Sequence, residues 1–470
     1  MSWKRREVVL SILVVAALWF IDAMMAEITY ALWFVDPPIG VEFSDYPVDT
    51  IWTVTENGGR VDWSHSGNNL IAFDRVGADG FYDVYIMTPE GEEVVCLTDR
   101  PGFVPQKHNG QPVWHLSGHY IVFQAEKDEN FDPDDRHFVS SEVSTPGRGW
   151  NCDLWCVDLQ DTSFTRLTNL PTRKTYSDTT PTSGVLHPHF SHDGTKLLWS
   201  ELLNGEADLG GRGDWGQWRL NLSKFVVDSS GPRLDSTEHF EPGEATFYES
   251  HGFSPDDSLI IFSGNLEPGQ HQIYMDIYSM NIYTHELKRL TFTTEDVWDE
   301  HAHYSLDGRE IVWMCSEGYS FIPDQWRATL STDYWLMNAD GSDKNRLTYF
   351  NELGHPEHTG ERVIMADCSW SPDGGRLVGF GAFVDTALGT GKWKIVMIEF
   401  EGMAGSRGDV NRDGQINILD VLKAVTIILE IEPPTDYEIW AADCNGDETI
   451  DVLDLVGIVN VILGIGLCSP

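Results

Sequence analysis

Basic residues are scarce in this sequence. It has 31 Lys and Arg residues against 74 Asp and Glu residues over 470 positions, which gives a formal net charge of −43 at pH 7. Binding to nucleic acid or to an anionic membrane depends on clustered Lys and Arg side chains that neutralise phosphate. The composition therefore excludes both as partners, and we interpret the acidity as a source of solubility.

Long hydrophobic runs are also rare, with one exception near the N-terminus. Lys4, Arg5 and Arg6 precede an apolar stretch of 13 residues from Val8 to Phe20, and Ala26 is a small residue suited to cleavage. A bilayer core requires about 20 apolar residues, so this run is short for an anchor. We predict a signal peptide at residues 1–26 and a secreted mature protein, extracellular, cell-surface or periplasmic, without membrane contact. An uncleaved anchor is the alternative.

Cysteines are few, and no CxxC pair or Cys/His spacing indicates a zinc site. Of the seven cysteines, Cys152 and Cys156 are four positions apart in an expected strand, too far for a disulfide. We predict a disulfide between Cys444 and Cys468, because an exported protein can keep one.

Nucleophile motifs are absent as well. The sequence has no GxSxG motif, no paired Ser/His/Asp arrangement and no Walker loop. A peptidase or esterase activity therefore has little support.

A short motif, an aromatic residue before a polar turn, recurs six times between residues 40 and 402. Each turn precedes an apolar strand, and a second strand with alternating apolar residues follows. Four of the units then end in CLT or RLT, whereas the third unit has RLDS at this place. Short strands joined by Asp-Gly and Ser-Gly turns are typical of β-propeller blades. The six aromatic residues, which we expect to pack between blades, are Trp63, Trp114, Phe190, Phe253, Tyr304 and Trp370.

The segments WSPDGGRLVGF and DYWLMNADGSDKNRLT resemble the TolB-like, WD-type propeller repeat, and the likeness extends over most of residues 58–400. The resemblance implies an all-β fold, a six-bladed β-propeller at residues 40–402. The last unit ends at KWKIVMIEF without an RLT strand. We predict that residues 49–56 supply this strand and close the ring, which removes exposed sheet edges.

Residues 408–470 have a different pattern, an acidic loop followed by an apolar helix, and then the same again. Oxygen ligands at loop positions 1, 3, 5, 7, 9 and 12 suit a hard, flexible cation such as calcium. Gly414 occupies position 6 of the first loop, where the sharp turn favours a positive φ. Glu448 occupies this position in the second loop, so we expect the second loop to bind calcium more weakly. The predicted ligands of two calcium ions are Asp409, Asn411, Asp413, Gln415, Asn417 and Asp420, and Asp443, Asn445, Asp447, Thr449, Asp451 and Asp454.

This arrangement resembles a dockerin type I module, which we place at residues 408–470 after a linker at 403–407. The alternative is a solvated acidic tail. The resemblance implies binding to a cohesin domain through positions 10 and 11 of each loop, which in this family are often hydroxyl residues. Here the apolar residues Ile418, Leu419, Val452 and Leu453 occupy these positions, so the partner is either a different cohesin or another domain of the same chain.

Five of the 16 histidines lie just before the turns of the third to fifth units: His187, His189, His251, His301 and His303. Side chains in a strand alternate between faces, so His-x-His places both imidazoles on one face. In a propeller these groups should gather near the central channel. Imidazole with nearby carboxylates suits manganese, iron or zinc, and Asp299, Glu300 and Glu249 are candidates for outer-shell groups.

The segment HPHFSHDG weakly resembles the His-Pro-His segment of oligogalacturonate lyases, which are seven-bladed propellers with a manganese site. That family has a Gln ligand three residues before the first His, where this sequence has Gly184. Three interpretations stay open: hydrogen-bonding histidines at the blade ends, a structural metal, or a catalytic metal.

Two functions follow from these observations. The first is a non-catalytic, secreted binding or scaffold component, whose propeller engages a polysaccharide or protein and whose dockerin attaches it to a partner. The second is a metal-dependent carbohydrate-active enzyme that uses the histidines, such as a lyase for uronate oligosaccharides. Trp150, Trp215 and Trp218 either stack on sugar rings or pack internally, and the RGD tripeptide at 212–214 is interpreted as chance.

Overall fold

The computed structural model describes residues 48–128, 143–172, 180–205, 215–243, 246–292, 297–386, 390–400, 405–412, 415–429, 431 and 433–468. The predicted signal peptide, the RGD tripeptide, Asp413 and Gly414 lie outside these residues. Among the described residues, no helix is both long and apolar enough to cross a bilayer.

The described strands form six four-stranded antiparallel sheets, which are the blades of a propeller. In the first five blades the strands pair in sequence order. Blade 1 contains β2 (Val61–Trp63), β3 (Ile71–Val76), β4 (Tyr82–Met87) and β5 (Val95–Cys96), and blade 2 contains β6 (Asn109–Trp114), β7 (Tyr120–Glu126), β8 (Cys152–Asp158) and β9 (Ser163–Arg166).

Blades 3 to 5 repeat this plan. Blade 3 contains β10 (Gly184–Phe190), β11 (Lys196–Asn204), β12 (Gln217–Asp228) and β13 (Gly231–Phe240). Blade 4 contains β14 (Tyr248–Phe253), β15 (Leu259–Gly264), β16 (Asp276–Asn281) and β17 (Leu287–Arg289). Blade 5 contains β18 (Asp299–Tyr304), β19 (Glu310–Cys315), β20 (Asp333–Asn338) and β21 (Asn345–Arg346), with a short 3-10 turn η2 (Pro323–Gln325) and α2 (Trp326–Thr329) between β19 and β20.

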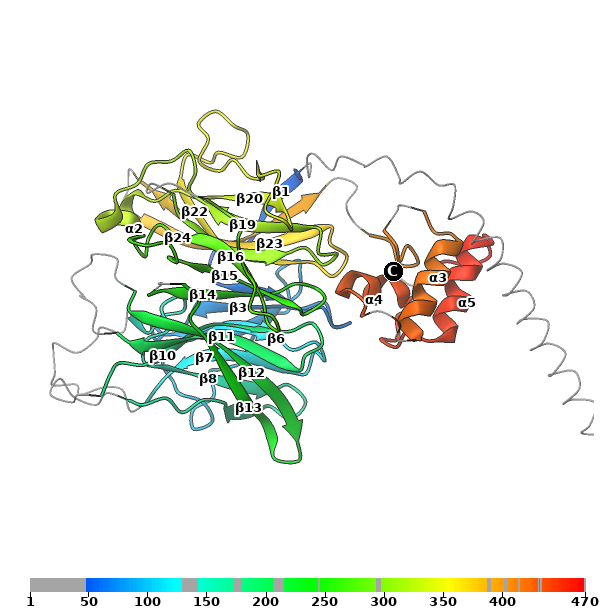
Figure 1. Cartoon of the computed structure of the whole chain (residues 1–470), viewed down its shortest axis with the longest axis horizontal. Coiled ribbons are helices and arrows are strands. Elements are labelled where there is room, and N and C mark those ends of the chain that lie inside the picture. Colours follow the sequence, from blue (N-terminus) through cyan, green and yellow to red (C-terminus); the bar gives the residue numbers. More distant parts are fainter. Residues whose placement is uncertain are drawn as a thin grey trace, which may run out of the picture. The chain divides into compact units, whose positions relative to one another are not determined.

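The sixth blade joins the two ends of the propeller sequence. It contains β22 (Arg362–Trp370), β23 (Arg376–Asp385) and β24 (Thr390–Phe400), and its outermost strand is β1 (Val48–Thr55). Figure 1 shows the blue β1 beside the orange β24, and the pairing runs from Val48 opposite Phe400 to Thr55 opposite Ile395. The predicted closure by residues 49–56 is confirmed.

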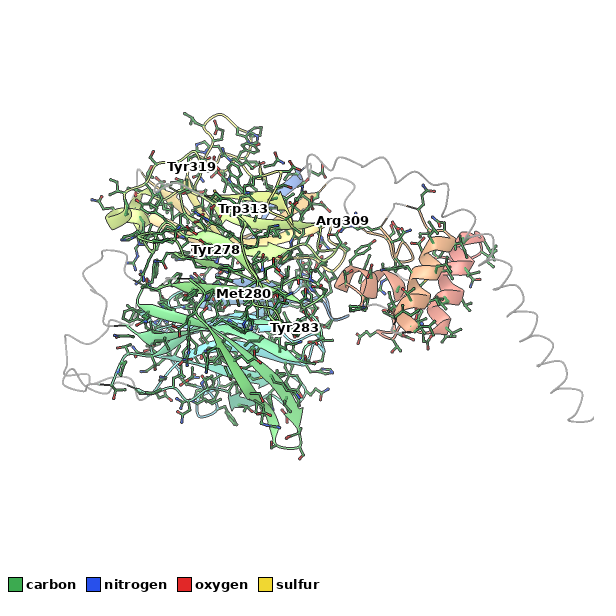
Figure 2. The ribbon with its side chains drawn as sticks, in the orientation of Figure 1. Tyr278, Met280, Tyr283, Arg309, Trp313 and Tyr319 are labelled. Atoms are coloured by element: carbon green, nitrogen blue, oxygen red, sulfur yellow. A yellow bond between two sulfur atoms is a disulfide. The ribbon has the colours of Figure 1, made fainter. Side chains whose placement is uncertain are left out.

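The repeat aromatics pack between neighbouring blades, as predicted. Trp114 of blade 2 packs in one cluster with Ala72 and Val84 of blade 1, and Tyr304 of blade 5 packs with Ile261 of blade 4. Tyr278 and Met280 on β16 and Trp313 on β19 are also buried in this body, whereas Tyr283, in the turn after β16, is 71% exposed (Figure 2).

The RLT segments have a structural role that the sequence pattern alone does not explain. In blade 4, Arg289 donates to Asp276 Oδ2 at 2.7 Å, and Thr291 Oγ1 donates to Asp276 Oδ1 at 3.3 Å. Blades 2 and 5 repeat this arrangement around buried Asp153 and Asp333. In these three blades the motif therefore supplies donors to a buried carboxylate near the start of the third strand, as buried charge requires.

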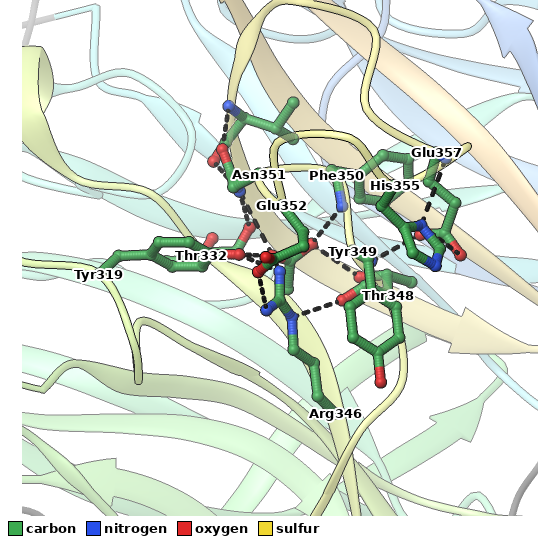
Figure 3. Close-up of polar contacts among 12 residues, drawn as sticks. Tyr319, Thr332, Arg346, Thr348, Tyr349, Phe350, Asn351, Glu352, His355 and Glu357 are labelled. Carbon is green, nitrogen blue, oxygen red and sulfur yellow. Dashed lines mark hydrogen bonds and ion pairs between the residues drawn. The ribbon is translucent and has the colours of Figure 1, made fainter.

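In blade 5 this arrangement grows into a larger network (Figure 3). Arg346 also lies 3.2 Å from Glu352 and donates to the hydroxyl of Tyr319, which itself donates to Asp333 at 2.9 Å. Glu357 accepts from the backbone N–H of Tyr349 at 2.6 Å. These contacts hold the loop after β21 against the blade.

The C-terminal region contains three helices: α3 (Ile418–Ile428), α4 (Asp436–Ala442) and α5 (Val452–Ile462). A small core that includes Val410, Ala424, Ala442 and Ile458 packs between them. The predicted disulfide between Cys444 and Cys468 is present. Helix α4 was not predicted, although Thr435 and Glu438 form a capping box at its start.

Candidate functional site

The innermost strands of blades 2 to 6 each contain an irregularity in register. The residues at these bulges include Gln111, His187, His251, His301 and Asp367. His187 and His301 have φ values of 46° and 55°, which are uncommon for residues other than glycine. Bulges redirect side chains and are frequent beside active sites. Simple alternation, which the His-x-His argument assumed, is therefore interrupted at His187.

All five predicted histidines converge: His187, His251 and His301 lie at the bulges, and His189 and His303 lie just beyond them on the same strands. The ring centroids of His187 and His301 are 5.2 Å apart, and that of His251 lies 5.5 Å from each of them. His189 and His303 form a second layer, with ring centroids 5.5 Å apart and only 5.9 Å between His187 and His189. Four blades contribute to the complete group, because Asp367 of blade 6 joins histidines from blades 3, 4 and 5.

Two carboxylates approach the histidine nitrogens closely. His187 Nε2 is 3.0 Å from Glu249 Oε1 and 3.5 Å from Asp367 Oδ1, and His301 Nδ1 is 2.9 Å from Asp367 Oδ1. Two ligands held at right angles about 2.1 Å from one ion lie about 3.0 Å apart. These separations are therefore compatible with ligands of a common cation.

Three nitrogens of this cluster have no hydrogen-bond partner. His189 Nε2, His251 Nδ1 and His303 Nε2 are buried and unsatisfied, whereas His187 Nε2 and His301 Nδ1 face the carboxylates of Glu249 and Asp367. Such atoms are costly unless something pairs with them. The other nitrogen of His251, Nε2, lies 2.6 Å from Ser263 Oγ, which leaves Nδ1 to face the cluster. A cation among these atoms would satisfy them together.

Two sets of ligand atoms meet the distances that a metal ion requires. One set is His187, His189 and His251, and the other is His187, Glu249 and His301, with all ligand atoms of a set within 4.8 Å of one another. His187 belongs to both sets. The second set combines imidazole with carboxylate, the mixture that suits manganese, iron or zinc.

Burial keeps most of these imidazoles neutral. It lowers the pKa of His187 to about 3 and that of His303 to about 4, and holds the pKa of His189 and His251 well below its usual range. Neutral imidazole is the form that binds a metal. Burial also raises the pKa of Glu249, and nearby Glu300 raises it further.

The predicted outer-shell residues have different positions. Glu249 belongs to the inner set, and Glu300 accepts from Trp298 Nε1 at 3.0 Å while lying 3.4 Å from His301 Nε2. Asp299 instead accepts a hydrogen bond at 2.9 Å from Nε1 of Trp313, which lies on the next strand, β19. Arg60, 3.6 Å from Asp367, was not predicted, because its blade has no histidine at this position.

A cavity of about 120 Å³ lies beside the turns that follow the first strands of the blades. His189, His251 and His303 line it, and so do the six repeat aromatics. Besides packing between blades, these aromatic residues therefore also form part of the wall of a cavity beside the histidine cluster. A smaller cavity of about 30 Å³ lies between Arg60, His187 and Asp367.

Of the three tryptophans considered as sugar-stacking candidates, two are buried. Trp150 and Trp218 are 5% and 1% exposed in the same hydrophobic cluster. Trp215 is half-buried against Trp298 and Trp326, with ring centroids at 6.1 and 5.8 Å.

The two acidic loops of the C-terminal region have matching local structure. Asp420 accepts from the backbone N–H groups of Asn411 and Asn417, at 3.0 and 2.8 Å, and Asp454 accepts in the same way from Asn445 and Asp451, at 3.1 and 2.8 Å. Asn417 and Asp451 cap α3 and α5. Glu448 has a φ of 65°, which supports the argument that position 6 favours glycine.

The predicted partner-binding residues are on the surface. Ile418, Leu419, Val452 and Leu453 are 48%, 53%, 62% and 63% exposed. Each pair begins one of the two matching helices, so the two halves of the region present equivalent apolar surfaces.

Comparisons with known proteins identify one region by sequence. Residues 407–463 match the dockerin type I domain, a family that binds cohesin domains and generally binds calcium. A search of curated protein sequences gives no match.

Solved structures resemble the propeller. TolB from Acinetobacter baumannii has 14% identity and a TM-score of 0.40, over 74% of this chain and 65% of that one, which is less than two thirds of its length. An oligogalacturonate lyase from Vibrio parahaemolyticus has 12% identity and a TM-score of 0.41 over 77% and 96%. An oligogalacturonate lyase in complex with manganese has 13% identity and a TM-score of 0.40, with the same coverage. These similarities concern the fold alone.

Proposed function

We propose that this chain is an exported protein whose propeller holds a divalent transition metal and engages an extracellular ligand, while its C-terminal region attaches it to a cohesin-bearing partner. The observation that supports the metal centre is the convergence of five histidines and two carboxylates around His187, which belongs to two sets of ligand atoms that each lie within 4.8 Å of one another. His187, His301 and Glu249 would hold the ion, with Asp367 beside them.

Metal analysis of the purified full chain tests this centre. We expect about one manganese, iron or zinc ion per chain, in addition to calcium, by mass spectrometry. His187→Asn should remove that ion, and asparagine tolerates the positive φ at this position. His271→Asn is the matched control, because His271 is exposed. Calcium alone in the wild type, or unchanged metal in His187→Asn, would contradict the proposal.

Attachment through the C-terminal region is supported by the match at residues 407–463 and by the exposed apolar pairs. Binding of a type I cohesin to the full chain can be measured by calorimetry with and without calcium. Leu419→Ser/Leu453→Ser should weaken it, and Val94→Ser, an exposed change on the propeller, should not. If no cohesin binds and the double variant behaves as wild type, the pairs serve another contact.

A metal-dependent enzyme acting on carbohydrate is the second candidate. It is favoured because all five histidines converge beside a cavity, the arrangement that this function requires. A bound cation would polarise a substrate oxygen, while the chain's own carboxylates and imidazoles would orient the ligand and transfer protons. Product formation from sugar oligomers that depends on both metal and His187 would support this candidate over a binding role.

A further inference from the structure

The helices that follow the two acidic loops match in position but differ in surface chemistry. The first half of the C-terminal region aligns with the second without a gap, from Asp409 onto Asp443, so that each residue of α3 has an equivalent in α5. The exposed apolar pairs that begin the two helices are equivalent. The differences come after these pairs, further along each helix.

Charge is the first difference. Asp454, the one charged residue of α5, is fully buried, and it accepts hydrogen bonds from two backbone N–H groups of its own loop. Three charged residues of the first half correspond to glycines in the second half: Lys423, Glu430 and Glu432 align with Gly457, Gly464 and Gly466. The surface of α5 therefore has no charged side chain of its own.

Apolar exposure is the second difference. Side chains separated by four, three and four positions lie on one face of a helix. Along α5 and the residue after it, such a stripe is entirely apolar, and its members are between 37% and 64% exposed: Val452, Val456, Val459 and Leu463. Ile465 and Leu467 extend this exposed apolar surface beyond the helix. A continuous surface of this kind indicates contact with another molecule.

Helix α3 presents less apolar surface. Leu422 and Val425, at the equivalent positions of the stripe, are half-buried. Lys423, halfway along α3, forms an ion pair with Glu438 of α4, with Nζ and Oε1 2.8 Å apart, and α4 packs against α3. A partner that docked on α3 would have to cover this pair, and removing charged groups from water costs free energy.

The family match gives the class of partner that covers the stripe. Residues 407–463 match the dockerin type I domain, this range includes all of α5, and such domains bind cohesin domains. The stripe is also continuous with Val452 and Leu453, which occupy the positions predicted to contact a cohesin. A second copy of this chain is a poorer fit, because a net charge of −43 on each copy opposes self-association.

We propose that a cohesin binds this chain in a single orientation, through the apolar surface of α5, with α3 at the edge of the contact or outside it. This inference rests on the proposed attachment to a cohesin-bearing partner. The cohesin surface that meets α5 is apolar and uncharged, because a charged group buried against the stripe would lose its hydration without gaining a partner.

Identical residues at equivalent positions provide the test. Leu453→Ser on α5 and Leu419→Ser on α3 make the same change at side chains that are 63% and 53% exposed. Binding of a type I cohesin to the calcium-loaded full chain is measured by calorimetry. We expect Leu453→Ser to weaken binding at least about tenfold and Leu419→Ser less than about twofold. Equal effects of the two variants, or a larger effect of Leu419→Ser, would overturn the inference.

A third variant tests the length of the stripe. Val456 is 53% exposed and lies outside the pairs that begin the helices, so Val456→Ser should weaken binding at least about threefold. Helical circular dichroism of each calcium-loaded variant should equal that of the wild type, because all three side chains are exposed. Unchanged affinity in Val456→Ser would confine the contact to the pair and contradict the proposed surface.

Amide hydrogen exchange locates the contact without any substitution. Binding of the cohesin should slow exchange in α5 and in the residues after it, and should change exchange in α3 much less. Equal slowing of both helices would overturn the single orientation. Equal protection of α5 with and without the cohesin would show that another part of the same chain already covers the stripe, which would also overturn the inference.

The two proposals fail separately in these experiments. If the wild type binds no type I cohesin, the proposed attachment fails and this inference fails with it. If the wild type binds the cohesin and the two leucine variants are weakened equally, the attachment stands and only the choice of α5 is wrong.

Discussion

At the residue scale, Asp62 is a buried carboxylate that connects neighbouring blades. It accepts from the backbone N–H of Trp114 at 2.7 Å and from Ser369 Oγ at 3.2 Å. Burial raises the pKa of Asp62 from 3.8 to about 6, although these hydrogen bonds oppose the shift. The folded protein therefore holds this proton more tightly than the unfolded chain does.

This difference predicts a pH-dependent effect of Asp62→Asn. The stabilising contribution of the Asp62 proton is complete below about pH 4 and is lost as the pH rises through about 6. The free energy of unfolding of Asp62→Asn, minus that of the wild type, should rise by about 2–3 kcal/mol between pH 4 and pH 7. Urea unfolding at several pH values measures it, and a constant difference would contradict the prediction.

The Asp–Arg–Thr arrangement gives a second prediction at this scale. Arg289→Ala leaves the fully buried Asp276 without its main charged partner, so the free energy of unfolding should fall by about 3 kcal/mol. Arg233→Ala is the control, because the pair of Arg233 with Asp228 is exposed and should contribute little to stability. Similar decreases in the free energy of unfolding of both variants would show that burial of the ion pair does not determine its contribution to stability.

The histidine cluster shows what sequence can and cannot predict about individual residues. Five histidines at equivalent repeat positions were sufficient to predict that they converge. The bulges were not predictable, because the residues that adopt positive φ, such as His187 and His301, have no distinctive local sequence. Arg60 was missed for a related reason, since its contact with Asp367 depends on ring closure between blades 1 and 6.

At the scale of elements, β1 is the strand whose removal has the clearest expected outcome. Deletion of residues 1–46 leaves β1 intact, whereas deletion of residues 1–56 removes β1 and exposes the edge of β24. We expect the second truncation to lower the melting temperature by several degrees and to promote aggregation, measured by calorimetry and light scattering. Equal melting temperatures would mean that closure contributes little to stability.

The repeat pattern predicted most strands because each blade carries the same turn and the same alternation. It failed where the chain leaves the pattern. β12 and β13 form a long hairpin of 12 and 10 residues in the blade that has RLDS. Helix α4 has only seven residues, and its burial of Tyr437 and Ala441 depends on packing against α3 rather than on a long periodic pattern.

At the scale of the whole molecule, the C-terminal region should require metal for its structure. Its two loops bring acidic side chains together, and these repel one another unless a cation is bound. Chelation of calcium should reduce helical circular dichroism while strand signals persist, and added calcium should restore it. A chain ending at residue 400 is the control, because its spectrum should not respond to calcium.

The division into a propeller and a calcium-binding region was predictable because each part repeats its own motif. The cavity beside the histidines was not, because it exists only where residues of all six blades meet. Trp63 and Trp370, which line it together, are more than 300 positions apart in the sequence. Only ring closure brings them to one wall.

The position of β24 determines how a pulling force would enter the propeller. Tension on an attached C-terminal region reaches the propeller at Phe400, the end of β24, which is hydrogen-bonded to β23 on one side and to β1 on the other. A strand held on both sides must break two ladders before it moves, whereas a strand at the sheet edge can be peeled away from one. Closure by β1 thus makes the connection to the C-terminal region more resistant to pulling, which suits a protein held in place while its surroundings flow.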